Sequence, residues 1–194
     1  MHHLPAHLLL LLAFWLAVGL WLGTELFLGS TRRGGGGKEL DSGTKNRAIL
    51  LFQAGILFSI AVSFLPWSLP QIHLIWIRWA GIVLVLLGVL VRIWAVHTLG
   101  QFFTVSIQIR EGQTVVHTGP YRWVRHPSYT GIMLSTAGFG LGLQNLASLV
   151  IALTFGFIAL YQRIRVEERV LLENLGKPYE EFCRGRKRLI PWIW

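Results

Sequence analysis

Long apolar runs separated by short polar segments occupy most of the chain. A helix needs about 20 apolar residues to cross a bilayer. Residues 4–28, 48–65 and 72–96 meet that length, and only Arg78 and Arg92 interrupt the third run. The pattern therefore predicts three membrane-spanning helices in the first half of the chain.

Two shorter apolar runs follow, at residues 129–143 and 146–162, with the turn-like sequence GLGLQN between them. They predict a helical hairpin that crosses the membrane and returns, through a locally thinned bilayer or with upright helices. The expected fold is an all-α integral membrane protein with five transmembrane helices. The hairpin lies towards its C-terminal end, and a polar loop and tail flank it.

The composition supports a membrane protein. A chain with 53% hydrophobic residues, 14% charged residues and a mean hydropathy of +0.54 is too apolar for an ordinary soluble domain. Residues 4–28 lack a basic leading region and a small-x-small cleavage site, so we interpret them as a retained span. The single cysteine, Cys183, excludes an internal disulfide framework and fits a free thiol in a reducing compartment.

Basic residues predict the orientation. Sixteen of the 18 Lys and Arg residues fall on one side of the five expected spans. The positive-inside rule then places the N-terminus outside and the tail in the cytoplasm. We expect the cell membrane, or the endoplasmic reticulum if the protein is eukaryotic. The sixteen residues are Arg32, Arg33, Lys38, Lys45, Arg47, Arg110, Arg122, Arg125, Arg163, Arg165, Arg169, Lys177, Arg184, Arg186, Lys187 and Arg188.

Two glycine-rich stretches do not indicate nucleotide binding. GGGGKE at residues 34–39 is not a phosphate loop, because Glu39 and not Ser or Thr follows Lys38. GFGLG at residues 138–142 lies inside an apolar helix, where small residues allow close helix packing. No nucleic-acid-binding motif accompanies the positive charge, so we expect anionic lipids and not nucleic acid beside it.

Candidate chemistry begins in the long link between residues 97 and 127, which ends in TGPYRWVRHPSY. The residue before a proline avoids the helical conformation, which makes His126 extended. Pro127 suits the first position of a helix. Free backbone N–H groups at such a helix start favour a negative or polar ligand.

A second polar concentration follows the fifth apolar run. Arg163 and Glu167 are four residues apart, so they share a helix face near the membrane surface. Ionisable groups at this depth suggest a functional site. A surface ion pair on an amphipathic interfacial helix is the alternative.

The two polar regions together carry a family resemblance. GPYRWVRHPSYTG, followed after the hairpin by RVEERVLLENLGKPYEEFCRGRKRLIPWIW, resembles the isoprenylcysteine carboxyl methyltransferase family, in particular its short prokaryotic members. The resemblance covers residues 115–194 and implies an integral membrane enzyme that uses S-adenosylmethionine. It divides the chain into three N-terminal transmembrane helices with a basic loop, residues 1–96, and a catalytic region, residues 97–194.

The resemblance also implies roles for individual residues. Arg163 corresponds to a residue that binds the substrate carboxylate, and Glu167 to an acidic contact of the cofactor. Glu168 belongs to the same motif without an assigned role. Gln113 stands where some relatives have His, in a loop that touches the cofactor through its backbone. The implied cofactor-binding residues are Gln113, Thr114, Val115, Val116, Tyr121, His126, Pro127, Ser128, Tyr129 and Glu167.

The implied reaction is methyl esterification of a C-terminal prenylcysteine that enters from the bilayer. Its carboxylate is ionised at neutral pH, so a general base is not required. An N-methyltransferase acting on phospholipids or amines is an alternative, although Arg163 would face a cationic amine. An NADPH-dependent membrane reductase is another; the basic tail could hold the cofactor's 2′-phosphate, but no specific motif marks such a site.

Overall fold

The computed structural model describes residues 6–31, 40–41, 43–65 and 75–194. Within these ranges the regular structure is helical, and extended pairing is limited to one isolated bridge between Val124 and Lys187. The prediction of an all-α protein is confirmed for this part of the chain. The elements are α1 (Ala6–Thr31), α2 (Thr44–Ser63), α3 (Ile75–Leu99), η1 (Gly100–Phe102), η2 (Gly119–Arg122), α4 (Pro127–Gly142), α5 (Leu146–Leu175) and α6 (Lys177–Arg184).

Four of the described helices, α1, α2, α3 and α5, are long and apolar enough to cross a membrane. The remaining candidate, α4, has 16 residues. At about 1.5 Å per residue it is about 24 Å long, shorter than a typical hydrocarbon core. A fifth span therefore stays a prediction. The glycine-rich loop at 34–39, the basic residues Arg32, Arg33 and Lys38, and the link at 66–71 lie outside the described residues.

The second arm of the hairpin is longer than its apolar run. α5 continues past residue 162 without a break to Leu175, because Gly and Pro are absent between Gly156 and Gly176. Asn145 caps its start, where the side-chain oxygen accepts from the Ser148 N–H at 3.1 Å. The extra turns carry Arg163 and Glu167 beyond the apolar segment on a rigid helix.

Glycines bring α3 and α4 into close contact. A Cβ atom added to Gly138 would lie 2.5 Å from the carbonyl oxygen of Gly81, and one added to Gly131 would lie 2.6 Å from that of Gly88. Neither position tolerates a side chain without movement of backbone. The prediction that the small residues at 138–142 serve helix packing is confirmed.

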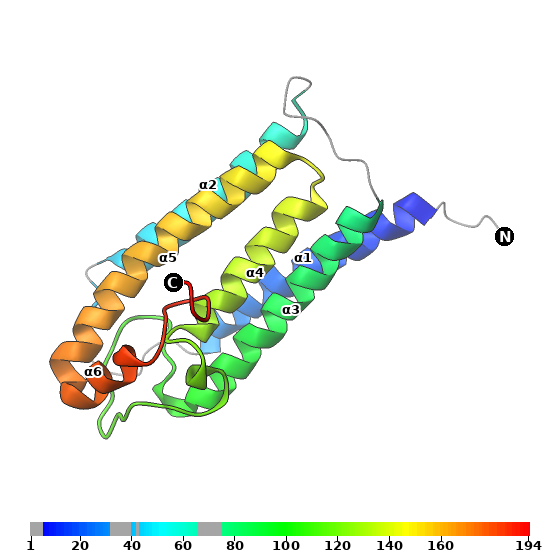
Figure 1. Cartoon of the computed structure of the whole chain (residues 1–194). Coiled ribbons are helices and arrows are strands. Elements are labelled where there is room, and N and C mark those ends of the chain that lie inside the picture. The colour runs from blue at the N-terminus through cyan, green and yellow to red at the C-terminus, as the bar shows by residue number, and fades with distance from the viewer. Residues whose placement is uncertain (1–5, 32–39, 42, 66–74) are drawn as a thin grey trace.

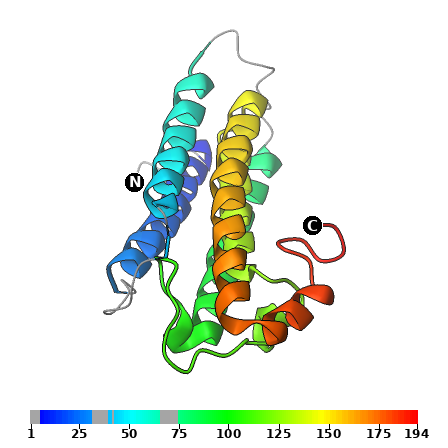
Figure 2. The ribbon, with the colours of Figure 1, turned by 90° about the vertical axis from the view of Figure 1, so that its left-hand side faces the viewer.

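The helices place the polar segments at one end of the molecule. α4 lies between α3 and α5 (Figure 1), and α2 runs along α5. The end of α3, the start of α4 and the end of α5 meet beside η1, η2 and α6 (Figures 1 and 2). Residues from the long link and from the tail are thereby gathered around the same point.

Candidate functional site

A pocket of about 870 Å³, part of it open to solvent, lies at this end of the helices. Its walls come from the link after α3, the start of α4, the last turns of α5 and α6. Pro127 lies outside this lining and is fully buried. The other predicted site residues all line the pocket, namely Gln113, Thr114, Val115, Val116, Tyr121, His126, Ser128, Tyr129, Arg163 and Glu167.

The start of α4 forms one wall as predicted. His126 is the residue before the helix, and Pro127 occupies the first turn. The His126 backbone is non-helical but not extended as expected, because its ψ is 61° (φ −127°). The His126 side chain is buried. Its ring stacks on that of Tyr129 at 5.6 Å between centroids and 21° between planes. The His-Pro step thus fixes two ring side chains against each other at the pocket.

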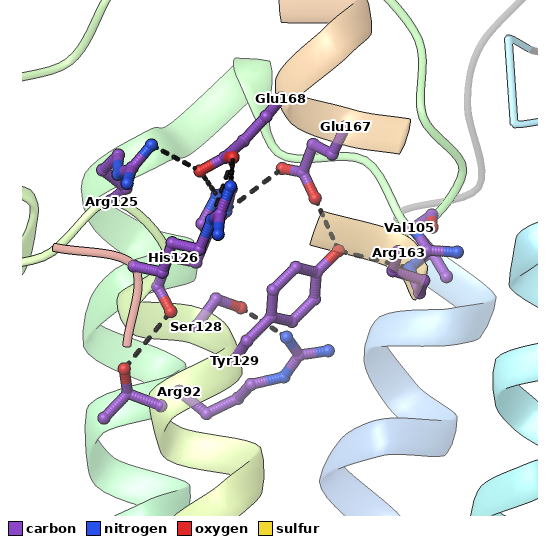
Figure 3. Close-up of polar contacts among 11 residues, drawn as sticks. Arg92, Val105, Arg125, His126, Ser128, Tyr129, Arg163, Glu167 and Glu168 are labelled. Carbon is purple, nitrogen blue, oxygen red and sulfur yellow. Dashed lines mark hydrogen bonds and ion pairs between the residues drawn. The ribbon is translucent and has the colours of Figure 1, made fainter. Parts of the chain in front are cut away.

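Tyr129 connects the two charged residues of α5 (Figure 3). Its hydroxyl donates to Glu167 Oε2 at 2.6 Å and accepts from Arg163 Nε at 3.2 Å. Arg163 is buried, with 7% of its surface exposed. The alternative of an ordinary surface pair on one helix face does not describe this arrangement, because a side chain from α4 stands between the two charges.

Asp41 is the ion-pair partner of Arg163. Arg163 Nη1 lies 3.4 Å from Asp41 Oδ2, and Arg163 Nη2 donates to the carbonyl oxygen of Val105 at 2.8 Å. Asp41 is itself buried and caps the start of α2 through bonds to the Thr44 hydroxyl and the Lys45 N–H. Pairing of this kind compensates for the removal of both charges from water. Asp41 was not predicted from the sequence, where its only signal is an acid within a basic segment.

Arg92 lies outside the pocket lining but supports one of its residues, Ser128. Its guanidinium donates from Nε and Nη2 to the two oxygens of Glu25 on α1, at 2.9 and 2.8 Å. Nη1 also bonds the hydroxyl of Ser128 in the first turn of α4. Arg92 had appeared in the sequence only as an interruption of an apolar run. In the fold it joins α1, α3 and α4.

Aromatic and aliphatic side chains form another wall of the pocket. Tyr121, Tyr179 and Phe182 are buried together, with Val115 and Val116 packed against them. Burial raises the pKa of Tyr121 and of Tyr179 well above the usual range, which keeps both phenols neutral. Tyr179 and Phe182 come from α6, a part of the chain for which the sequence predicts only a polar tail.

Comparison with known proteins identifies the region that builds this pocket. Residues 81–173 match the model described as the isoprenylcysteine carboxyl methyltransferase (ICMT) family. The match covers just under half of the chain. It includes η2, α4 and most of α5, and with them Tyr121, His126, Arg163 and Glu167.

Individual relatives agree with the match. The chain is 38% identical over 115 residues to protein-S-isoprenylcysteine O-methyltransferase of Saccharomyces cerevisiae, covering 58% of this chain and 48% of the yeast protein. It is 34% identical over 96 residues to YpbQ of Bacillus subtilis, covering 49% of this chain and 57% of that protein. Protein-S-isoprenylcysteine O-methyltransferase B of Arabidopsis thaliana is 31% identical over 120 residues, with 61% of each chain covered. The chain thus spans about half to three fifths of the length of these relatives.

Proposed function

We propose that this protein is an integral membrane methyltransferase that uses S-adenosylmethionine to esterify the carboxylate of a C-terminal prenylcysteine. One observation carries the proposal. Glu167 and Arg163, an acid and a guanidinium one helical turn apart, face one pocket and share the hydroxyl of Tyr129. The names of the yeast and Arabidopsis relatives support the same reaction.

The donor side of the pocket suits the chemistry of S-adenosylmethionine. Glu167 would bind its cationic groups, and His126 and the start of α4 offer hydrogen-bonding groups for its polar ones. Tyr121, Tyr179 and Phe182 form an apolar wall for the adenine ring. When bound, S-adenosylmethionine supplies an electrophilic methyl group on a sulfonium.

The acceptor side is assigned to Arg163. A carboxylate is already ionised at neutral pH, so the protein has to hold and orient it and need not deprotonate it. A guanidinium can do this with two parallel hydrogen bonds. Tyr129, Val105 and Asp41 fix the Arg163 side chain within a buried setting, which limits water beside the reacting groups.

The proposed membrane arrangement follows the charges. α4 would be a short fifth span, the N-terminus would lie outside, and the pocket would lie at the cytoplasmic edge of the bilayer. The start of α2, which carries Lys45, and η2, which carries Arg122, lie at the pocket end of the molecule (Figure 2). The start of α3, which carries Arg78, lies at the opposite end. Residues 97–194 would catalyse, and residues 1–96 would support them and admit the prenyl chain from the lipid.

Titration calorimetry on the detergent-purified protein tests the donor. We expect binding of S-adenosylhomocysteine and none of NADPH, whereas the reverse would favour a reductase. Transfer of labelled methyl from S-adenosylmethionine then tests the acceptor. Transfer to N-acetyl-farnesylcysteine is expected, and exclusive transfer to a phospholipid amine would contradict the proposed substrate.

A further inference from the structure

The carboxylate of Glu168 is surrounded by donors from two parts of the chain, the residues just before α4 and the C-terminal segment (Figure 3). Arg125 Nη1 lies 2.8 Å from Oε1, and His126 Nε2 lies 3.2 Å from the same oxygen. Arg188 donates to Oε2 from Nε at 3.0 Å and from Nη2 at 2.8 Å. Protein groups therefore engage both oxygens of Glu168.

Glu168 differs in this respect from the residue beside it. Successive residues on a helix point about 100° apart, because a turn holds about 3.6 residues. Glu167 lines the pocket, whereas Glu168 lies outside its described lining, and its side chain is less exposed, at 13% against 29%. Glu168 thus contacts the walls of the pocket and not its contents.

The partners of Glu168 connect the C-terminal segment, residues 186–194, to the start of α4. The Arg125 N–H donates to the Lys187 carbonyl oxygen at 2.8 Å, and the His126 N–H donates to that of Arg188 at 3.0 Å. The Thr130 hydroxyl donates to the Leu189 carbonyl oxygen at 2.7 Å. Glu168 lies on α5, so its contacts join α5 to the start of α4 and to the C-terminal segment.

The same contact orients the ring of His126. Nε2 faces Glu168, while Nδ1 faces the pocket side and lies 3.9 Å from Glu167 Oε1. A carboxylate that accepts from one ring nitrogen fixes both the tautomer and the plane of an imidazole. Without Glu168 the ring could rotate about its χ2 bond and turn Nδ1 away from the pocket.

We propose that Glu168 is a positioning residue of the methyl-donor site: it fixes the His126 ring and fastens the C-terminal segment to the start of α4. This inference rests on the proposed function, because it takes the ligand beside His126 and Glu167 to be the donor. Glu168 acts through His126 and does not touch the donor itself.

Glu168→Gln in the full-length protein tests the inference, because it keeps the size of the side chain and removes its charge. We expect the Kd for S-adenosylhomocysteine to rise about tenfold, the effect of losing one hydrogen bond to a charged group. The KM of the acceptor at saturating donor should stay unchanged. Glu173→Gln, on an exposed position of the same helix, is the matched control and should leave both values unaltered.

Arg188→Gln removes only one of the three partners and is expected to raise the same Kd by a smaller factor. It keeps the test available if Glu168→Gln does not fold. Trypsin supplies a readout that does not depend on the donor, since Arg186 and Lys187 lie in the fastened segment. We expect cleavage there to be faster in Glu168→Gln than in the wild type.

Unchanged donor binding in a folded Glu168→Gln protein would overturn the positioning role, even if its tail were cleaved faster. Unchanged cleavage together with unchanged binding would overturn both parts of the inference. A wild-type protein that did not bind S-adenosylhomocysteine would instead contradict the proposed function, and the trypsin comparison would still decide whether Glu168 fastens the segment.

Discussion

Single side chains determine how the two charges of the pocket are kept apart. The Tyr129 hydroxyl lies between Glu167 and Arg163, so each keeps a separate set of contacts. Arg163 is held on its other side by Asp41 and by the carbonyl oxygen of Val105. A buried guanidinium with three protein partners is fixed in orientation, which is what recognition of a planar carboxylate requires.

The Asp41 contact can be tested separately from the helix cap. Asp41→Asn retains a side-chain oxygen that caps α2, but it removes the charge opposite Arg163. If Asp41 orients Arg163, the KM of the prenylcysteine acceptor should rise about tenfold, in the range for a lost charged hydrogen bond. S-adenosylhomocysteine binding by calorimetry should not change.

Thr44→Ala is the control for capping, because the Thr44 hydroxyl also bonds Asp41 but does not contact Arg163 in the described structure. We expect it to lower thermal stability without the change in KM. A lower acceptor KM in Asp41→Asn would mean that Asp41 competes with the substrate for Arg163, contrary to the positioning role.

At the scale of elements, the pocket depends on how closely α3 and α4 approach. The close glycine contacts bring the start of α4 against α3 beside Arg92. Arg92 bonds Ser128 on α4 and Glu25 on α1. α5 extends beyond the apolar run as one helix and brings three charged residues to the pocket end of the molecule, Arg163, Glu167 and Glu168. The site is therefore built on helix ends that packing fixes.

The contact between α3 and α4 predicts a large effect of a small substitution. Gly138→Ala would place a Cβ atom 2.5 Å from the Gly81 carbonyl oxygen, so the helices must separate. We expect a loss of about 1–3 kcal/mol, the usual range for overpacking, seen as a lower Tm in detergent. Gly19→Ala on α1 meets no atom within 4 Å and is the control. Equal Tm values for the two variants would show that the close approach is not needed.

Particular residues show what the sequence could and could not provide. The place of Pro127 in the first turn of α4 and a non-helical backbone at His126 were predictable from proline geometry, although His126 is not extended. The pocket lining followed from the family resemblance of the HPSY and Glu167 motifs. Asp41, Arg92 and Arg188 were not found, because their partners are distant in sequence and depend on how helices pack. The apolar run marks only the first part of α5; the spacing of Arg163 and Glu167 predicted that the helix continues, but not that it ends at Leu175.

At the scale of the whole molecule, all groups assigned to chemistry lie at one end of the helices. The opposite end holds the start of α1 and the turn between α4 and α5 (Figure 1). A water-soluble donor and a lipid-soluble acceptor can meet at such an end if it lies at a membrane surface. From the distribution of Lys and Arg we propose that this end faces the cytoplasm.

Cysteine labelling in sealed, right-side-out vesicles tests this orientation. In a Cys183→Ala background, Glu111→Cys in the link and Leu146→Cys at the start of α5 introduce exposed thiols at the two ends. We expect a membrane-impermeant maleimide to label only Leu146→Cys until the vesicles are opened. Labelling of Glu111→Cys in intact vesicles would reverse the proposed topology.

The central claim is that Glu167 serves the donor and Arg163 serves the acceptor on either side of Tyr129. Binding of S-adenosylhomocysteine and methyl transfer to N-acetyl-farnesylcysteine, measured on the same preparations of Glu167→Gln and Arg163→Lys, test it most directly. Lysine keeps the charge but loses the planar fork that orients a carboxylate. Arg165→Lys, at an exposed position of the same helix, is the control.

The two substitutions are expected to affect different measurements, donor binding in one and methyl transfer in the other. Glu167→Gln should bind S-adenosylhomocysteine about 10- to 100-fold more weakly, the effect of losing a charged hydrogen bond, and recover transfer at saturating donor. Arg163→Lys should bind S-adenosylhomocysteine normally and lose transfer by a similar factor even at saturating donor. Weakened donor binding in Arg163→Lys, with transfer restored by excess donor, would contradict the claim and make Arg163 a structural partner of the donor site.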